Sequence, residues 1–245
     1  MLPHNFENTP LPVTEIFQSI SGEGISSGNV VVFVRLAGCN LRCTWCDTKY
    51  SLEEKAPGTV LLLPGEILHQ VKSFGINEVI CTGGEPLEED KPKRALPLYL
   101  AANGVKVRIE TSGASPLYTL EEFNAFAGAE PNIQYCMDVK CPASKMVYKN
   151  NLKNIALLRQ GDELKFVVQD QTDLNFSFDV IEAYKFHLSE KKIAINFSPV
   201  FGAIKPVEIV NFLKEKANYS CENSLWVRLS LQIHKYIWPP HKRGV

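Results

Sequence analysis

The chain has 245 residues, of which 45 % are hydrophobic, and its formal net charge is −1. This length and hydrophobic content are sufficient for one large core, so we expect a single domain over residues 1–245. The near-zero charge excludes the basic surface typical of polynucleotide binding, and we expect a small-molecule partner and no nucleic acid.

The seven cysteines are an odd number, and they do not form the dense framework of a small secreted protein. Residues 1–12 have neither the basic nor the apolar region of a signal peptide. No apolar run approaches the length needed to span a bilayer. We therefore expect a soluble, cytoplasmic protein without membrane contact.

Short apolar runs alternate with segments of helical period along the chain. The runs are Val30–Leu36, Glu78–Cys81, Val105–Ile109, Ile133–Val139, Leu164–Val168, Ile193–Phe197 and Leu225–Leu229. Such alternation predicts an α/β fold with a parallel sheet and helices on its outside. Since about six or seven units fall short of the eight of a closed TIM barrel, we expect a partial, open TIM-like barrel.

Three segments carry clear helix signals. Gly75 follows an apolar helical face made of Ile67, Leu68, Val71 and Phe74. Thr119 and Glu122 predict a capping box, and Pro97 predicts a break in the helix expected between residues 91 and 103. Pro206 predicts the start of a helix whose buried stripe is Val207, Ile209, Val210 and Leu213.

Three cysteines follow the first apolar run. Cys39, Cys43 and Cys46 have the spacing Cys-x3-Cys-x2-Cys, with Trp45 in the last spacer. Three thiolates can bind three irons of a [4Fe–4S] cluster, which leaves the fourth iron open to a ligand. A structural zinc site normally needs four ligands, usually in two pairs, and no second pair follows. The spacing favours the cluster, with a structural metal as the alternative, and a cluster suits a reducing compartment.

Glycines and polar residues follow the strands that come next. These segments are Thr82–Pro86, Glu110–Gly113, Asp138–Pro142 and Ser198–Gly202. Because the carboxyl ends of parallel strands form one rim, we expect these segments to converge on the cysteine loop. Gly83 and Gly84 would allow close backbone approach to a ligand, and Glu85 would accept hydrogen bonds from an ammonium. Lys165 is compatible with the rim or with a solvated strand end, and no role is assigned to it.

The cysteine spacing with an aromatic residue at position 45 resembles the signature of the radical S-adenosylmethionine (SAM) enzymes. In that family the open iron binds SAM, and the reduced cluster cleaves it to methionine and a 5′-deoxyadenosyl radical. The resemblance implies a [4Fe–4S] cluster on the three cysteines, and SAM as the second cofactor. The SAM contacts that it implies are Trp45, Asp47, Gly83, Gly84, Glu85, Gly113, Asp138, Val139, Lys140, Ser198, Pro199, Val200 and Phe201. The alternative for Lys140 is an exposed rim cation.

A finer resemblance lies in the stretch from Glu15 to Gly24, in Phe33–Asn40, and in Cys46-Asp47-Thr48. These motifs resemble the 7-carboxy-7-deazaguanine synthases, and the likeness extends from about Thr14 to Val245. That family consists of lyases that convert 6-carboxy-5,6,7,8-tetrahydropterin to 7-carboxy-7-deazaguanine with loss of ammonia, on the route to queuosine and other deazapurines. A magnesium ion assists the reaction.

The finer resemblance implies a Mg²⁺ ligand and a set of substrate contacts. Thr48 would give its hydroxyl to Mg²⁺, which prefers oxygen ligands. The substrate contacts would be Ile20, Ser21, Gly22, Glu23, Arg35, Thr111, His234 and Val245. Arg35 would meet the substrate carboxylate with its planar fork, and Glu23 would accept from the guanidine-like edge of the pterin. The family has glutamine where this chain has Ser21, and the alternative for His234 is a packed histidine. No residue is assigned as an acid or a base.

Two other functions are alternatives. A glycyl-radical-enzyme activating protein shares the cysteine spacing and the small barrel but acts on a protein, and the set Gly22-Glu23-Gly24, Arg35 and Thr48 argues against it. A non-catalytic metal-binding scaffold would contain zinc or no metal. The family resemblance further implies a flavodoxin- or ferredoxin-type electron donor, and small open barrels often form homodimers.

Overall fold

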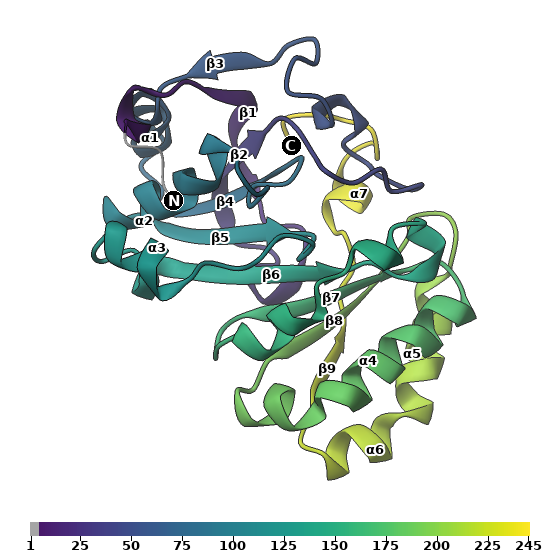
Figure 1. Cartoon of the computed structure of the whole chain (residues 1–245). Helices are drawn as coiled ribbons and strands as arrows, with labels where there is room; N and C mark the ends of the chain where they lie inside the picture. Colours follow the sequence, from purple (N-terminus) through teal and green to yellow (C-terminus); the bar gives the residue numbers. More distant parts are fainter. Residues whose placement is uncertain (1–4) are drawn as a thin grey trace.

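The computed structural model describes residues 5–245, and its nine strands form one sheet in the order β3-β1-β2-β4-β5-β6-β7-β8-β9. The strands are β1 (Leu11–Ile20), β2 (Val30–Leu36), β3 (Val60–Leu62), β4 (Glu78–Gly83), β5 (Lys106–Thr111), β6 (Ile133–Val139), β7 (Glu163–Val168), β8 (Ala194–Pro199) and β9 (Trp226–Leu229). Strands β2 and β4 to β9 run parallel, whereas β1 pairs antiparallel with β2 and β3. Since β3 and β9 are the two edges, the sheet stays open, which confirms the expected partial barrel (Figure 1).

All seven expected strands are present, and they are the seven parallel strands of the sheet. Val30–Leu36 and Ile133–Val139 coincide with β2 and β6 residue for residue. Strands β1 and β3 were not among the expected strands. Strand β1 includes Pro12 and mixes buried with half-buried residues, so it forms no continuous apolar run. Strand β3 is three residues long and largely exposed.

The helices cover one face of the sheet, α1 to α3 along its first half and α4 to α6 along its second (Figure 1). These six helices are α1 (Pro64–Ser73), α2 (Leu96–Ala102), α3 (Leu120–Ala125), α4 (Gln171–Glu190), α5 (Pro206–Glu215) and α6 (Ala217–Glu222), whereas α7 (His234–Ile237) packs against the turn after β1. The capping box is confirmed, since Glu122 N donates to Thr119 Oγ1 and Thr119 N donates to Glu122 Oε2. The break also occurs: a 3-10 turn, Pro92–Ala95, ends before Pro97, which lies in the first turn of α2.

The buried stripe of α5 differs from the prediction. Ile209 is buried and Leu213 packs against the core, but Val207 and Val210 are 56 % and 36 % exposed. Phe212 is buried in their place. At 100° per residue, positions 209, 212 and 213 share one face, whereas 207 and 210 turn away from it.

The parallel strands have an apolar and a polar face. Side chains such as Ile109, Val139, Phe166 and Phe197 belong to the hydrophobic core. The alternate positions on the same strands include the buried polar residues Arg108, Asp138, Glu163, Lys165, Asn196 and Ser198. Since successive side chains of a strand point to opposite faces, these polar groups line the concave inside of the open barrel.

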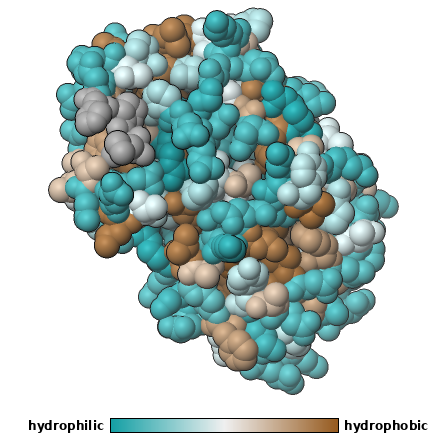
Figure 2. All heavy atoms as spheres, in the orientation of Figure 1, coloured by the Kyte–Doolittle hydropathy of each residue, from teal (hydrophilic) through white to brown (hydrophobic). Residues whose placement is uncertain are grey.

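The outer surface is largely hydrophilic, with hydrophobic residues in separate patches on the face that Figure 2 shows. Between residues 5 and 245 there is no helix that is both long and apolar enough to cross a membrane.

Candidate functional site

A cavity of about 300 Å³ lies at the carboxyl ends of the parallel strands, beside the cysteine loop. It brings together most of the site residues expected from the sequence. Those that line it are Ile20, Ser21, Gly22, Glu23, Arg35, Cys39, Cys43, Trp45, Cys46, Asp47, Thr48, Gly83, Gly84, Thr111, Asp138, Lys140, Val200, Phe201, His234 and Val245. Five expected cofactor contacts do not line it, namely Glu85, Gly113, Val139, Ser198 and Pro199.

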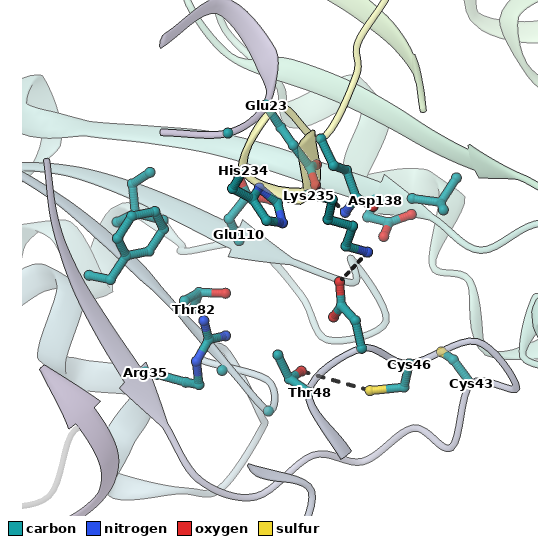
Figure 3. Close-up of a pocket in the computed structure, with 18 of the residues that line it drawn as sticks. Glu23, Arg35, Cys43, Cys46, Thr48, Thr82, Glu110, Asp138, His234 and Lys235 are labelled. Atoms are coloured by element: carbon teal, nitrogen blue, oxygen red, sulfur yellow. Dashed lines mark hydrogen bonds and ion pairs between the residues drawn. The ribbon is translucent and has the colours of Figure 1, made fainter. Parts of the chain in front are cut away.

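The three cysteines are free, half-buried thiols on the loop that follows β2. Cys46 N donates to Cys43 O in a tight turn, and the Cys46 Sγ lies 3.8 Å from the Thr48 hydroxyl (Figure 3). Burial raises the pKa of Cys39 to about 11, and burial also raises the pKa of Cys43. In the described residues, no three His, Cys, Asp or Glu side chains are grouped tightly enough for a single metal ion. Three thiols on one short loop are a donor set that fits an iron–sulfur cluster.

The two glycines after β4 allow the close approach of two loops. A Cβ at Gly83, whose φ is +123°, would overlap the backbone of Leu36. A Cβ at Gly84 would overlap the carbonyl of Gly38, directly before Cys39. These glycines therefore fit the end of β4 against the cysteine loop, in addition to lining the cavity.

Glu85 is placed differently from our expectation, because its carboxylate is buried and already hydrogen-bonded. Oε1 accepts from Leu87 N at 2.9 Å and from the Thr111 hydroxyl at 2.7 Å. Oε2 accepts from the backbone N and the hydroxyl of Ser112, at 2.8 and 2.6 Å. Glu85 thus joins the β4 loop to the end of β5, and the prediction that its carboxylate faces a ligand ammonium does not fit this geometry. Gly113 N donates to Thr111 Oγ1 at 3.2 Å in the same network.

Two carboxylates flank the Lys165 ammonium on the cavity floor. Its Nζ lies 3.0 Å from Glu23 Oε2 and 2.7 Å from Glu110 Oε2, and Gln232 donates to Glu23 Oε1. Burial alone would raise the pKa of Glu23, but the attraction of Lys165 and the Gln232 hydrogen bond together hold it at about 2. Of these residues, Lys165 had been left between the rim and a solvated strand end, Glu110 had been expected at the rim without a role of its own, and Gln232 had not been singled out. The available signal was a lysine inside an otherwise apolar buried strand.

A second ion pair lies beside the cysteine loop. Lys140 Nζ is 2.7 Å from Asp138 Oδ2 and 5.2 Å from the centroid of the Trp45 ring. Lys140 is 9 % exposed, so it is not an exposed rim cation. Burial opposes the charge, yet Asp138 keeps the pKa of Lys140 above its usual value. Asp138 Oδ1 and Trp45 Nε1 are buried and have no hydrogen-bond partner within residues 5–245. An orphaned acceptor and an orphaned donor beside the cysteines fit a polar ligand such as SAM.

Arg35 occupies the opposite side of the cavity, where its side chain points toward Thr82 (Figure 3). Its Nε lies 2.6 Å from Glu15 Oε1, which also accepts from the Tyr50 hydroxyl at 2.9 Å. This contact uses only Nε, so the two terminal nitrogens of the fork remain for a ligand. The stacked rings of Phe17 and Phe33, with centroids 5.1 Å apart, form an apolar wall of the cavity.

The turn after β1 packs against α7. Ser21 Oγ lies 2.7 Å from Ser26 Oγ and donates to Glu23 O at 3.3 Å, so this hydroxyl is engaged within the turn. A Cβ at Gly22 would overlap the His234 ring, and Ile233 N donates to Gly22 O at 3.0 Å. His234 is thus both packed and part of the cavity wall. Burial lowers its pKa, although Glu23 opposes the shift.

The tail after α7 returns to the first half of the sheet, where the C label lies near β2 in Figure 1. Residues 240–245 line the cavity. The Arg243 guanidinium carbon lies 3.8 Å from the centroid of the Tyr50 ring. Closer to α7, Lys235 Nζ lies 3.2 Å from Asp47 Oδ2, the contact dashed in Figure 3. These two contacts connect the end of the chain to the cysteine loop and the segment after it.

Comparison with known proteins shows the family to which this chain belongs. The family model described as the radical SAM superfamily matches residues 33–158. The 7-carboxy-7-deazaguanine synthase of Clostridium acetobutylicum is 42 % identical over 95 % of this chain and 98 % of that protein. The synthase of Koribacter versatilis is 35 % identical over 96 % of this chain and 100 % of that protein.

Solved structures share the fold. The crystal structure of QueE from Escherichia coli has a TM-score of 0.63 at 21 % identity and covers 91 % of this chain and 93 % of that one. Streptococcus suis SuiB, bound to S-adenosylmethionine, has a TM-score of 0.53 at 15 % identity and covers 79 % of this chain and 48 % of that one.

Proposed function

Because the chain belongs to the 7-carboxy-7-deazaguanine synthases of the radical SAM superfamily, we propose that it is a lyase that converts 6-carboxy-5,6,7,8-tetrahydropterin to 7-carboxy-7-deazaguanine with loss of ammonia. The observation that carries this proposal is one cavity shared by the three-cysteine loop and by Arg35 and Glu23. The cysteines suit an iron–sulfur cluster, and the two charged side chains suit the carboxylate and the guanidine-like edge of a carboxypterin.

We assign the cofactor contacts from the side chains beside the cysteine loop. Cys39, Cys43 and Cys46 would hold a [4Fe–4S] cluster, and Trp45 and Asp138 would offer their unpartnered polar atoms to SAM. When bound, the cluster and SAM would supply a 5′-deoxyadenosyl radical. Lys140, paired with Asp138, would hold that carboxylate in its orientation.

The protein would hold the substrate so that one C–H bond meets the reactive carbon in a near-attack geometry. The terminal nitrogens of Arg35 would bind the substrate carboxylate, while Glu15 fixes the guanidinium through its contact with Nε. Glu23 would accept hydrogen bonds from the pterin, since its oxygens have further lone pairs beyond those used by Lys165 and Gln232. The Ser21 hydroxyl is engaged within its turn, so contacts there would come from the backbone.

Thr48 is our candidate ligand for Mg²⁺. Its hydroxyl lies 3.8 Å from the Cys46 sulfur and lines the cavity, between the cysteine loop and the Arg35 side. A hard cation there would have an oxygen ligand and room for waters, and it would orient the substrate carboxylate.

We also propose an electron donor, an oligomeric state and a cellular setting for this chain. A flavodoxin- or ferredoxin-type protein would deliver the electron, and the chain would act as a homodimer of single-domain subunits. A reducing, cytoplasmic setting suits seven free cysteines and a cluster.

An anaerobic turnover assay tests the proposed reaction. Reconstituted protein is incubated with SAM, dithionite and 6-carboxytetrahydropterin, and the products are identified by mass together with released ammonia. The proposal predicts 7-carboxy-7-deazaguanine and ammonia in equal amounts. Cluster-loaded protein that cleaves SAM but forms no deazaguanine would instead favour the glycyl-radical activating alternative, and protein that takes up only zinc would favour the scaffold.

A further inference from the structure

Lys93 is a fully buried lysine beneath the cysteine loop, in the 3-10 turn before α2. Its side chain is 1 % exposed. Nζ donates to Ala37 O at 3.0 Å and to Gly38 O at 2.6 Å, and lies 2.7 Å from Glu88 Oε2. A buried ammonium is costly unless it is hydrogen-bonded and paired with an opposite charge. Lys93 has both, with two backbone carbonyls as hydrogen-bond acceptors and one carboxylate at ion-pair distance.

The two carbonyls that Lys93 binds belong to the link between β2 and Cys39. Gly38 has a φ of +90°, and its carbonyl also accepts from Glu85 N at 2.9 Å. Gly38 N donates to Ser51 O at 2.9 Å, and Cys39 N donates to Leu52 O at 3.0 Å. The backbone before the first cysteine is thus fixed from several sides, and Lys93 brings a full positive charge to it.

We propose that Lys93 is a positioning residue of the cluster site: it holds the Ala37 and Gly38 carbonyls so that Cys39 faces the cavity, and its charge favours the reduced cluster. The inference rests on the proposed cluster but not on the identity of the substrate. A [4Fe–4S] core with three thiolates is anionic and becomes more so on reduction, and the charges and hydrogen bonds around a cluster set its potential. The negative charge of Glu88 offsets part of the positive potential that Lys93 produces at the cluster. The Glu88 side chain is 18 % exposed, however, so it is better solvated than the Lys93 ammonium.

A purely structural lysine would act on stability alone. In that case, its removal would lower the melting temperature and leave the cluster of the remaining folded protein unchanged. Arg94 is the matched control, since it is adjacent, pairs with Glu122 at 2.7 Å, and donates to Leu87 O at 2.9 Å. Its hydrogen bonds go to Leu87, Pro116, Leu117 and Glu122, not to the cysteine loop.

The experiment compares Lys93→Met with Arg94→Met. Both proteins are reconstituted without oxygen; iron and sulfide per chain, the midpoint potential from EPR-monitored titration, and the melting temperature of the apo-protein are measured. Both variants should have a lower melting temperature than wild type. Only Lys93→Met should bind severalfold less iron per chain than wild type. Its cluster should also have a more negative midpoint potential, whereas that of Arg94→Met should be unchanged. A Lys93→Met protein with the wild-type potential and iron content would overturn the inference.

Glu88→Gln keeps the inference testable if Lys93→Met does not fold. It keeps a polar side chain of nearly the same size beside Lys93 and removes the opposing charge, so the midpoint potential should shift to more positive values. An unchanged potential in this variant would contradict the electrostatic role. Wild-type protein that binds no cluster would overturn the proposed function itself, so the two failures are distinguishable.

Discussion

Lys165 Nζ lies 3.0 Å from Oε2 of Glu23, although the two residues are 142 positions apart. Lys165 belongs to β7, and Glu23 belongs to the turn that joins β1 to β2, so the pair spans the inside of the open barrel. Glu110 on β5 is the second partner of the same ammonium, at 2.7 Å. The ion pairs therefore connect strands from both halves of the sheet and shape the floor of the cavity.

The Glu23–Lys165 pair should make stability depend on pH. The folded-state pKa of Glu23 is about 2, below the ordinary value of 4.5, so its contribution is full above pH 4.5 and is lost as pH falls toward 2. Glu23→Gln should cost about 3 kcal/mol at pH 7, because it leaves the buried ammonium with one carboxylate. The difference from wild type should shrink between pH 4.5 and pH 2.

Urea unfolding of the apo-proteins at several pH values measures this difference. Glu190→Gln is the control, since Glu190 is exposed and pairs with its neighbour Lys191. A Glu23→Gln penalty that stays constant down to pH 2 would refute the assigned pairing.

Cluster assembly should depend on the loop cysteines and not on the others. Cys43→Ala should abolish the assembly of a four-iron cluster, because Cys43 is one of only three thiols on the loop. Cys221 is exposed on α6, away from the cavity lining, so Cys221→Ala should keep wild-type iron content and activity. Iron and sulfide analysis after reconstitution decides the matter, and loss of iron in the second variant would show that the ligands are assigned wrongly.

The Thr48 hydroxyl should govern the response to magnesium. Thr48→Val removes an oxygen ligand at nearly constant volume, so turnover should depend less on added Mg²⁺ while SAM cleavage continues. Thr48→Ser retains the hydroxyl and should keep the magnesium response. Initial rates measured over a magnesium titration give the comparison. Identical curves for Thr48→Val and the wild-type protein would show that Thr48 does not bind Mg²⁺.

The stacking of Arg243 on Tyr50 should help to retain the substrate. The contact has a centroid distance of 3.8 Å at the edge of the cavity, and cation–π contacts contribute about 1 kcal/mol when partly exposed. Arg243→Ala should therefore raise KM for the carboxypterin about fivefold, with a smaller effect on kcat. Arg228→Ala is the control, because Arg228 stacks on Trp226 on β9, outside the cavity. Equal KM values for the two variants would argue against a role for the tail.

Most of the parallel sheet could be predicted because its buried strands are apolar runs separated by glycine and proline. Strand β1 escaped prediction since its stability comes from pairing with β2 and β3, and its mixed burial leaves no pattern of its own. The stripe of α5 was misassigned because Val207 and Val210 are apolar yet exposed, and only the packing of Phe212 on the sheet fixes which face is buried.

The candidate site was predictable where a local motif carries it, as in the cysteine loop and the turn around Glu23. Residues that only the register of the sheet brings together could not be predicted. Lys165 lies opposite Asp138 across the β6–β7 pairing and near Glu110 on β5, and no local pattern reveals that arrangement. Glu85 turned inward for a similar reason, since Thr111 and Ser112 on the neighbouring strand end supply donors that the motif alone does not show.

EPR spectroscopy of the reduced, reconstituted protein shows whether one iron of the cluster is open to a ligand. A cluster held by Cys39, Cys43 and Cys46 alone should give a reduced [4Fe–4S] signal whose g values change when SAM is added, because the iron without a cysteine ligand would be free to bind SAM. A spectrum that is identical with and without SAM, in protein containing four irons per chain, would contradict the account.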